Sequence, residues 1–480
     1  MTTAAVGDVK GREQPVIAAP VEGNPYTRAL ATYIAGLRFE DIPAEVIGRA
    51  KLLILDSLGC GLFGALPRHS RILLDTLATL DRSTECGVWG TRQRLSAPHA
   101  ALVNGSMIQA FELDDAHGRG SVHTGSGALP ALMAVVETRP GLSGKAFLAA
   151  VVAAYEAAPR VGLCVGQGYA GRGWHSGSLA VFSGAAAAAS ALGLTPGQTV
   201  HALGIAGTQA AGLMAAQYGA MVKRMHAGRG AQGGLYAAFL AEAGYTGIEN
   251  LFESEYGGFC TTYTGTRDSF DLEALRRGLG ETFETLRTSL KFYASAASTH
   301  TALDALRALR ARRPFQPRDV ERIVVHASQR VVEHVGWAYR PIGLTSAQMN
   351  LPFCAATLLL EGDVFVEQFS EDAITDPARM ALAERVEVRE DPAVTARGRD
   401  ARYEVRVQVR LADETVLEET VAAARGSEKR FATEADVIAK FEKLAKRVLP
   451  ARQVDELRDR VLHLETLPDA GRLPLLLAMR

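Results

Sequence analysis

Apolar residues recur at helical spacing over most of the first 280 residues. Stretches such as EVIGRAKLLILDSLGCGLFGAL, HAALVNGSMIQAFELDD and GSLAVFSGAAAAASALGL place apolar side chains three and four positions apart, with small residues between them. The chain holds 47 glycines, and helices lined by small residues can approach one another closely. The pattern therefore predicts a tightly packed helical core. In this setting the small residues 184–189 indicate helix packing rather than a phosphate-binding loop.

The pattern changes near residue 285, where signals for strands begin. ERIVVHAS contains a β-branched run, and RYEVRVQVRL alternates apolar with polar residues. This alternation predicts an antiparallel strand with one buried and one solvated face. Its apolar positions are Tyr403, Val405, Val407, Val409 and Leu411. SAQMNLPFCAATLLLEG predicts a buried helix, and TEADVIAKFEKLAKRVL and QVDELRDRVLHL return to helical periodicity.

These changes predict a mainly α fold, with a large all-helical domain formed by both chain ends and a smaller inserted α+β domain. We expect a disordered tail over residues 1–24 and the first part of the helical domain over 25–284. The α+β domain would cover 285–425, and the C-terminal return to the helical domain 426–480. No repeat of 20–50 residues interrupts this arrangement.

Composition narrows the functional classes. Among the 480 residues, 52 Lys and Arg balance 53 Asp and Glu, which gives a formal net charge of -1. Balanced charge provides no electrostatic signal for nucleic acid or an anionic membrane surface. No apolar run approaches the roughly 20 residues that span a bilayer, because charges, Gly or Pro interrupt every candidate. The first 25 residues lack the order of a signal peptide, so we expect a cytoplasmic protein.

The five cysteines are scattered along the chain and form no C-x-x-C pair. This spacing disfavours zinc ribbons, disulfide scaffolds and a cysteine-ligated cluster, and it fits a reducing compartment. The cysteines are Cys60, Cys86, Cys164, Cys260 and Cys354.

The first candidate site is FELDDAHGRGSVHTGSG. A predicted helix with Glu112, Asp114 and Asp115 runs into a Gly-rich loop with His117 and His123. Such a loop brings carboxylates close to imidazoles, which titrate near neutral pH and suit acid–base catalysis. The alternative is a helix C-terminus followed by ordinary polar loop residues. Because no H-E-x-x-H or similar spacing is present, we expect no metal ion.

Two further motifs combine cations and histidine with small residues. In GRGWHSGSLAVFSG, His175 precedes a predicted helix whose free N–H groups suit a carboxylate, although a capping role is the alternative. In MVKRMHAGRGAQGG, Lys223, Arg224, His226 and Arg229 lie within seven residues. Cations among small apolar residues indicate an anionic partner, whereas on the other interpretation they cover a solvated face.

The transition between the domains carries the last candidates. SLKFYASAASTHTALDA contains Lys291, Tyr293 and His300, and WAYRPIGLTSAQMN contains Tyr339 and Arg340. No G-x-S-x-G, phosphate loop or cofactor motif accompanies them. Histidine, lysine, arginine and aspartate without a nucleophile suit removal of a proton next to a carboxylate, with cations holding carboxylates and the developing negative charge.

These motifs, in this order, resemble the MmgE/PrpD family, which includes 2-methylcitrate dehydratase, cis-aconitate decarboxylase and iminodisuccinate epimerase. The matching stretches are NGSMIQAFELDDAHGRGSVHTGSGALPAL, RGWHSGSLAVFSGAAAAASALGL, VKRMHAGRGAQGG and LKFYASAASTHTALDA, and LLILDSLGCGLFGA is similar to the family's N-terminal helix. The resemblance implies a helical domain built from both chain ends, an α+β lid domain, a homodimer, and catalysis without metal or organic cofactor.

The resemblance also implies roles for single residues. His123 matches the loop histidine, His175 the histidine of the Gly-rich turn, and Lys223 and Lys291 the two site lysines. Tyr339 is similar to a tyrosine of the lid.

Three positions depart from the family's pattern. Ala116 stands where the acidic motif usually has Thr, and Thr124 stands where Pro is common. Ala296 takes the place of a histidine that follows the second lysine in the decarboxylase. The changes at Ala116 and Ala296 weigh against decarboxylation of cis-aconitate.

The leading hypothesis is therefore a cofactor-independent dehydratase of the 2-methylcitrate type, acting on a small hydroxy di- or tricarboxylate. His123 or Lys223 would remove the α-proton, and His117 or His175 would help the β-hydroxyl to leave. Epimerisation of a dicarboxylate and decarboxylation are alternatives, and an inactive helical binding protein is an alternative of another class. The catalytic candidates are His123, Lys223, His175, Lys291, Asp115 and His117. The substrate-binding candidates are Glu112, Arg224, His226, Tyr339 and Arg340.

Overall fold

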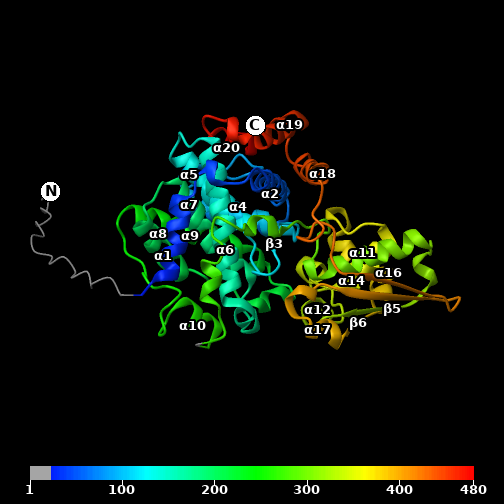
Figure 1. The fold of residues 1–480 in the computed structure, drawn as a ribbon. Coiled ribbons are helices and arrows are strands. Elements are labelled where there is room, and N and C mark those ends of the chain that lie inside the picture. The colour runs from blue at the N-terminus through cyan, green and yellow to red at the C-terminus, as the bar shows by residue number, and fades with distance from the viewer. Residues whose placement is uncertain (1–22, 267, 480) are drawn as a thin grey trace, which may run out of the picture.

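The computed structural model describes residues 23–266 and 268–479 (Figure 1). Most of the tail expected over residues 1–24 lies outside this range. The described chain is mainly helical with small sheets, which confirms the predicted fold class. A helical part and a part that contains the largest sheet lie side by side in Figure 1.

Residues 25–264 supply ten α-helices of the helical part. Helices α4, α5, α6, α7 and α9 pack on one another at its centre. Their bounds are α1 (Pro25–Gly36), α2 (Ala44–Phe63), α3 (Arg68–Leu80), α4 (Ala97–Ile108), α5 (Gly125–Thr138), α6 (Gly144–Gly171), α7 (Ala180–Ala191), α8 (Pro196–Gly207), α9 (Met225–Glu242) and α10 (Phe259–Thr264).

Glycine allows α7 and α9 to approach closely, as the small residues predict. A Cβ atom on Gly234 of α9 would lie 2.4 Å from the backbone nitrogen of Ala185 on α7. One on Gly230 would lie 2.7 Å from the nitrogen of Val181. No side chain fits at such distances, so the two backbones are in direct contact. Residues 184–189 therefore serve helix packing.

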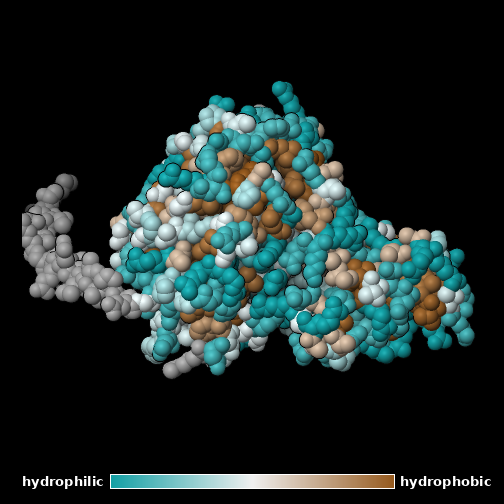
Figure 2. Space-filling view, viewed as in Figure 1, coloured by the Kyte–Doolittle hydropathy of each residue, from teal (hydrophilic) through white to brown (hydrophobic). Residues whose placement is uncertain are grey.

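Helix α6 corrects one expectation from the sequence. It is 28 residues long and apolar enough to cross a membrane, although Gly166 interrupts its helical geometry. Its most apolar window is 94% buried inside the protein, which is typical of the central helix of a helical core. The face in Figure 2 mixes teal and brown patches without a continuous apolar band.

The second part is built on a four-stranded sheet in the order β6-β5-β7-β8. Its strands are β5 (Val320–Ala327), β6 (Val386–Glu390), β7 (Val405–Leu411) and β8 (Val416–Val421). β5 pairs with β6 in parallel, and the other pairs are antiparallel. Strand β7 buries alternate residues, as its sequence predicts, and α11 (Ala297–Arg312) packs on β7 and β8.

Six shorter helices complete this part. Asn350 separates α13 from α14 by capping α14, so the predicted buried helix is divided in two. The helices are α12 (Gln329–Val335), α13 (Leu344–Gln348), α14 (Leu351–Glu361), α15 (Glu371–Ile374), α16 (Pro377–Ala383) and α17 (Pro392–Ala396).

A strand pair and the C-terminal helices connect the parts of the molecule. Strand β3 (Ala116–His117) pairs with β4 (Thr288–Ser289), so the first candidate motif lies beside the fourth. The C-terminal helices α18 (Glu434–Ala445), α19 (Ala451–Leu462) and α20 (Arg472–Leu477) return to the helical part, where α18 packs on α2 (Figure 1). A second small sheet pairs β1 (Cys86–Gly87) with β2 (Arg94–Leu95).

Candidate active site

A cavity of about 700 Å³ lies where the helical part meets the sheet-containing part. The turn after α4, the start of α11 and the helix α12 contribute to its wall. Several predicted candidates line it together: Glu112, His117, His123, His175, Lys223 and Lys291. Residues from four separate sequence motifs therefore share one cavity.

Glu112 is held by three cations. Its carboxylate accepts hydrogen bonds from Lys223 and Arg224, and its Oε2 lies 3.6 Å from Lys291 Nζ. Burial alone would raise the pKa of Glu112, but the three cations outweigh burial and hold this pKa well below its ordinary value. Glu112 is therefore a fixed negative charge that positions both lysines.

The acidic residues do not lie on a helix, so that part of the sequence interpretation is wrong. Helix α4 ends at Ile108, and a short 3-10 turn runs to Phe111. Glu112 then takes the left-handed conformation, with φ 56° and ψ 29°, which stops a helix of L-residues. This turn lets successive carboxylates point in different directions.

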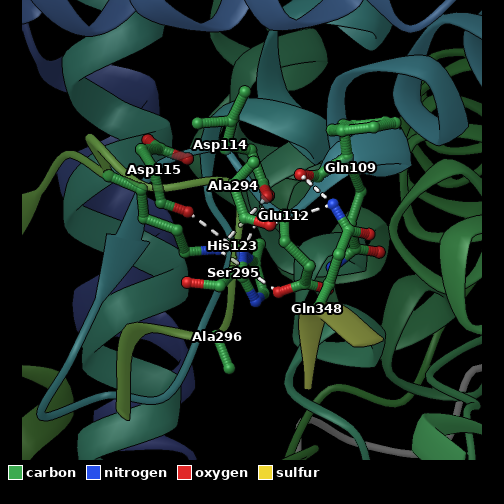
Figure 3. A network of polar contacts seen from close by, with 12 residues as sticks. Gln109, Glu112, Asp114, Asp115, His123, Ala294, Ser295, Ala296 and Gln348 are labelled. Atoms are coloured by element: carbon green, nitrogen blue, oxygen red, sulfur yellow. Dashed lines mark hydrogen bonds and ion pairs between the residues drawn. The ribbon is translucent and has the colours of Figure 1, made fainter. Parts of the chain in front are cut away.

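Asp114 and His123, both labelled in Figure 3, form a dyad in which His123 lines the cavity. His123 Nδ1 lies 2.8 Å from Asp114 Oδ2 and 3.0 Å from the carbonyl oxygen of Asp115. Burial tends to raise the pKa of Asp114, but His123 and Lys291 lower it to about 2. Because both neighbours of Nδ1 are acceptors, a neutral His123 carries its proton on Nδ1 and presents the Nε2 lone pair.

His175 is oriented the opposite way. It caps the 3-10 turn Ser176–Leu179, and its Nδ1 accepts a hydrogen bond of 3.1 Å from the Gly177 N–H. Burial, with Lys223 and His226, holds the pKa of His175 well below its ordinary value. The neutral ring therefore carries its proton on Nε2 and is a hydrogen-bond donor. It stacks on His123, with the ring centroids 6.3 Å apart.

The two lysines differ in their titration. Burial lowers the pKa of Lys223 to about 8, with Glu112 acting against burial and Arg224 adding to it. Burial also opposes the charge on Lys291, but Asp114 and Glu112 outweigh it and raise the pKa of Lys291. Lys291 therefore stays cationic, whereas Lys223 titrates near neutral pH.

Three predicted residues lie behind the cavity wall rather than on it. Arg224 donates to Glu112 and, over 2.8 Å, to Gln348 Oε1. His226 packs behind His175, and burial lowers its pKa to about 4. Asp115 accepts hydrogen bonds from Tyr155 and from the Gly125 N–H.

Asp115 and His117 are both buried, with different neighbours. Burial raises the pKa of Asp115 to about 7, and Asp114 adds to this effect. His117 reaches the cavity wall, but both ring nitrogens are engaged. Its Nε2 lies 3.0 Å from Glu284, and its Nδ1 accepts from the Gly120 N–H.

Tyr339 and Arg340 do not reach the cavity. The Tyr339 hydroxyl donates to the carbonyl oxygen of Ile374 over 2.8 Å, and its ring packs on Phe353. Arg340 is exposed, and its carbonyl oxygen accepts from Ser346. The loop at 337–343 therefore supports α13 and α15 instead of contributing to the site.

The sheet-containing part instead contributes residues that the sequence did not single out. Arg330 and His334 of α12 and Arg402 before β7 line the cavity. Arg402 donates to Gly118 O and Ser121 Oγ, over 3.0 and 3.2 Å. Within the part of the chain that the structure describes, Arg330 has no hydrogen bond or ion pair, and its Nε is buried. Such a guanidinium is a candidate for binding an external anion.

His334 adds a further imidazole. Its Nδ1 lies 2.9 Å from Ser298 Oγ at the start of α11. Burial, with Arg330 and Arg402, holds the pKa of His334 well below its ordinary value. Only the folded chain brings these residues together, because the motif around α12 reads as an ordinary amphipathic helix.

The arrangement suits a small polyanion. Lys223, Lys291, Arg330 and Arg402 surround a space that also contains a histidine acceptor and a histidine donor. Across residues 23–266 and 268–479, no group of three or more His, Cys, Asp or Glu side chains is arranged to hold a metal ion. The side chains present can bind carboxylates and move protons.

Comparison with known proteins identifies sequence relatives over almost the whole chain. Residues 28–271 match the MmgE/PrpD N-terminal domain, and residues 293–466 match the MmgE/PrpD C-terminal domain. The chain is 36% identical to the cis-aconitate decarboxylase-like protein oryM of Aspergillus oryzae, over 94% of this chain and 97% of that protein. It is 32% identical to cis-aconitate decarboxylase of Aspergillus terreus, over 93% and 94%. The human cis-aconitate decarboxylase is 28% identical over 94% of each chain.

Proposed function

Because this chain belongs to the MmgE/PrpD family, we propose that it is a decarboxylase of an unsaturated tricarboxylate similar to cis-aconitate. The observation that carries the proposal is the set of unneutralised cations around the stacked His123–His175 pair. The relatives named as cis-aconitate decarboxylases favour this reaction over the dehydration expected from the motifs.

The proposed reaction needs only binding and proton transfer. One carboxylate is attached to the saturated carbon next to the double bond. The bond between that carbon and the carboxylate breaks, and CO₂ leaves. The electron pair of the broken bond forms a new double bond to the neighbouring carbon. The electrons of the original double bond move to the carbon that carries another carboxylate. That carbon then takes a proton, which completes the product.

The cavity offers a residue type for each step. Arg330, Arg402 and Lys291 would hold the carboxylates that remain, and their charge would stabilise the enolate-like intermediate. His175 presents an N–H that can hold a carboxylate oxygen, and His123 is oriented by Asp114. In its protonated form His123 would deliver the proton from Nε2 to the carbon and return to the neutral ring. Lys223 would supply a further positive charge below its pKa of about 8.

Dehydration is the second candidate, and the alanines at positions 116 and 296 favour it. Both line the cavity where the resemblance places Thr and His in the decarboxylase. However, His334 and Ser298 line the same cavity, so an imidazole is present although residue 296 is alanine. We therefore place decarboxylation first.

The test is incubation of the purified chain with cis-aconitate in deuterated water. We expect release of CO₂ and one solvent deuterium in the product, measured by mass spectrometry. His123→Ala should lower kcat/KM by about 10²- to 10⁴-fold, whereas His463→Ala, at an exposed position of the C-terminal region, should not change it.

Other outcomes contradict the proposal in different ways. Loss of water from a hydroxytricarboxylate without CO₂ release would support dehydration. Deuterium uptake with isomerisation would support epimerisation. Binding of tricarboxylates without any turnover would support a binding protein.

A further inference from the structure

A second cavity adjoins the candidate active site. It measures about 820 Å³, including space open to solvent, and shares part of its wall with the first cavity. The shared residues are Ala116, Gly118, Lys291, Ala297, Arg402 and Tyr403. Lys291 therefore faces both spaces, and a ligand held by Lys291 in the first cavity is next to the second.

Small residues line the passage between the two cavities. Ala116 lies on β3, opposite Ser289 of β4, and Ala297 is the first residue of α11. Each presents only a methyl group. A side chain of ordinary size at either position would project into the shared wall, so alanine at both keeps the connection open.

The wall of the second cavity is largely apolar. Leu290 and the three successive alanines 422–424 contribute to it, with Ala116 and Ala297 at the shared side. Two cations at this cavity already have partners. Arg425 pairs with Asp436 over 2.6 Å, and Lys429 donates to the carbonyl oxygen of Asp400 over 2.9 Å.

The second cavity provides an apolar space next to the cations that would hold a six-carbon acid. An unsubstituted tricarboxylate among Lys223, Lys291 and Arg330 would leave the alanine-lined space without an apolar occupant.

We propose that the substrate is a polycarboxylate with an alkyl substituent, and that the alkyl chain occupies the second cavity along the wall formed by Leu290 and residues 422–424. This inference rests on the proposed function for the position of the carboxylates. The chain passes between Ala116 and Ala297, while the charged end stays with the cations of the first cavity.

The first test is affinity along a chain-length series. Saturated tricarboxylates without a substituent and with methyl, propyl or hexyl chains are titrated into the purified full chain by calorimetry. Each buried methylene should tighten Kd about fourfold, the ratio that corresponds to about 0.8 kcal/mol. Because these compounds do not react, a flat series overturns the inference whether or not cis-aconitate loses CO₂.

The second test blocks the wall. Ala423→Phe should weaken binding of the hexyl compound at least tenfold and leave the unsubstituted compound unchanged. The control is Ala412→Phe at the exposed turn between β7 and β8, which should change neither. Equal weakening of both compounds by Ala423→Phe contradicts the inference.

A third comparison examines the arginines near this cavity. Within the described chain, Arg119 and Arg399 line it without a hydrogen bond or ion pair to a carboxylate. We expect a hexyl chain to bind more tightly than a chain of equal length that ends in a carboxylate. Tighter binding of the chain that ends in a carboxylate would contradict the inference that the second cavity holds an apolar chain. The series on the unmodified chain decides the question even if a variant fails to fold.

Discussion

At the scale of single residues, the site combines charged side chains that are paired with an opposite charge and arginines that are not. Glu112 is bound by Lys223 and Arg224, and Asp114 by His123 and Lys291. Arg330 and Arg402 have no carboxylate partner among the described residues. The paired charges fix geometry, and the unpaired guanidinium groups are available to a ligand.

The low pKa of Lys223 predicts a basic limb in the pH profile. Burial lowers this pKa to about 8, so the free enzyme loses the positive charge as pH rises through about 8. The value of kcat/KM, which reports the free enzyme, should therefore fall above pH 8. Lys223→Arg keeps its charge at all these pH values, so its residual activity should lack this limb. An unchanged limb in that variant would assign it to another group.

Arg330 is expected to bind substrate. Arg330→Gln should lower kcat/KM by 10- to 100-fold, because a hydrogen bond to a charged group contributes about 1.5–3 kcal/mol. The matched control is Arg340→Gln, an exposed arginine of the same region outside the cavity, which should stay within about twofold. Steady-state kinetics with cis-aconitate measure both. Equal effects of the two variants would contradict a specific role for Arg330.

At the scale of helices and strands, the spacing of apolar residues was sufficient to predict the regular elements. Strand β7 follows the alternating pattern because one of its faces is buried, whereas α7 and the second half of α2 are apolar and buried on all sides. The end of α4 did not follow the apolar spacing. A left-handed residue at Glu112 has no periodic signal, so the turn that separates the carboxylates could not be predicted.

The histidine and lysine motifs were predictable because each is local. Arg330 and Arg402 were not, since they are 72 residues apart and only the pairing of β5 with β7 brings their segments together. Tyr339 was wrongly placed at the site for the same reason, because the sequence around a predicted loop does not show which way a polar side chain points. Residues within one motif can be grouped from sequence, but those from different elements require the fold.

The close contact of α7 with α9 gives a prediction for this scale. Gly234→Ala places a methyl group 2.4 Å from a backbone nitrogen of α7, so it should destabilise the protein by about 1–3 kcal/mol through overpacking. Gly48→Ala is the control, because a Cβ atom at this exposed position of α2 meets nothing within 4 Å. It should stabilise by about 1 kcal/mol. Urea unfolding measures both, and equal signs would contradict direct backbone contact.

At the scale of the whole molecule, the cavity belongs to two parts at once. The helical part supplies Glu112, His123, His175 and Lys223, and the sheet-containing part supplies Arg330. Although the net charge is only -1, positive charge is concentrated at the junction. The average charge of the chain therefore hides the local field that a substrate encounters.

This concentration of charge predicts a salt effect. Because salt screens attraction between a cationic cavity and a polyanion, kcat/KM should fall several-fold between 0.02 and 0.5 M sodium chloride, to about a third or less. The kcat of the bound complex should change much less. If kcat falls as much as kcat/KM, salt changes the structure of the protein rather than the attraction between cavity and substrate, which contradicts the prediction.

The return of α18 to the helical part has a consequence for synthesis. Lys440 of α18 pairs with buried Asp56 over 2.6 Å and donates to the carbonyl oxygen of Leu113 over 2.7 Å. Leu113 lies between Glu112 and Asp114, so the backbone of the acidic turn is tied to a residue translated more than 300 positions later. Since translation proceeds from the N-terminus, a nascent chain that has completed both α9 and the sheet still lacks this tie. The ribosome must therefore pass residue 440 before the acidic turn reaches its final form.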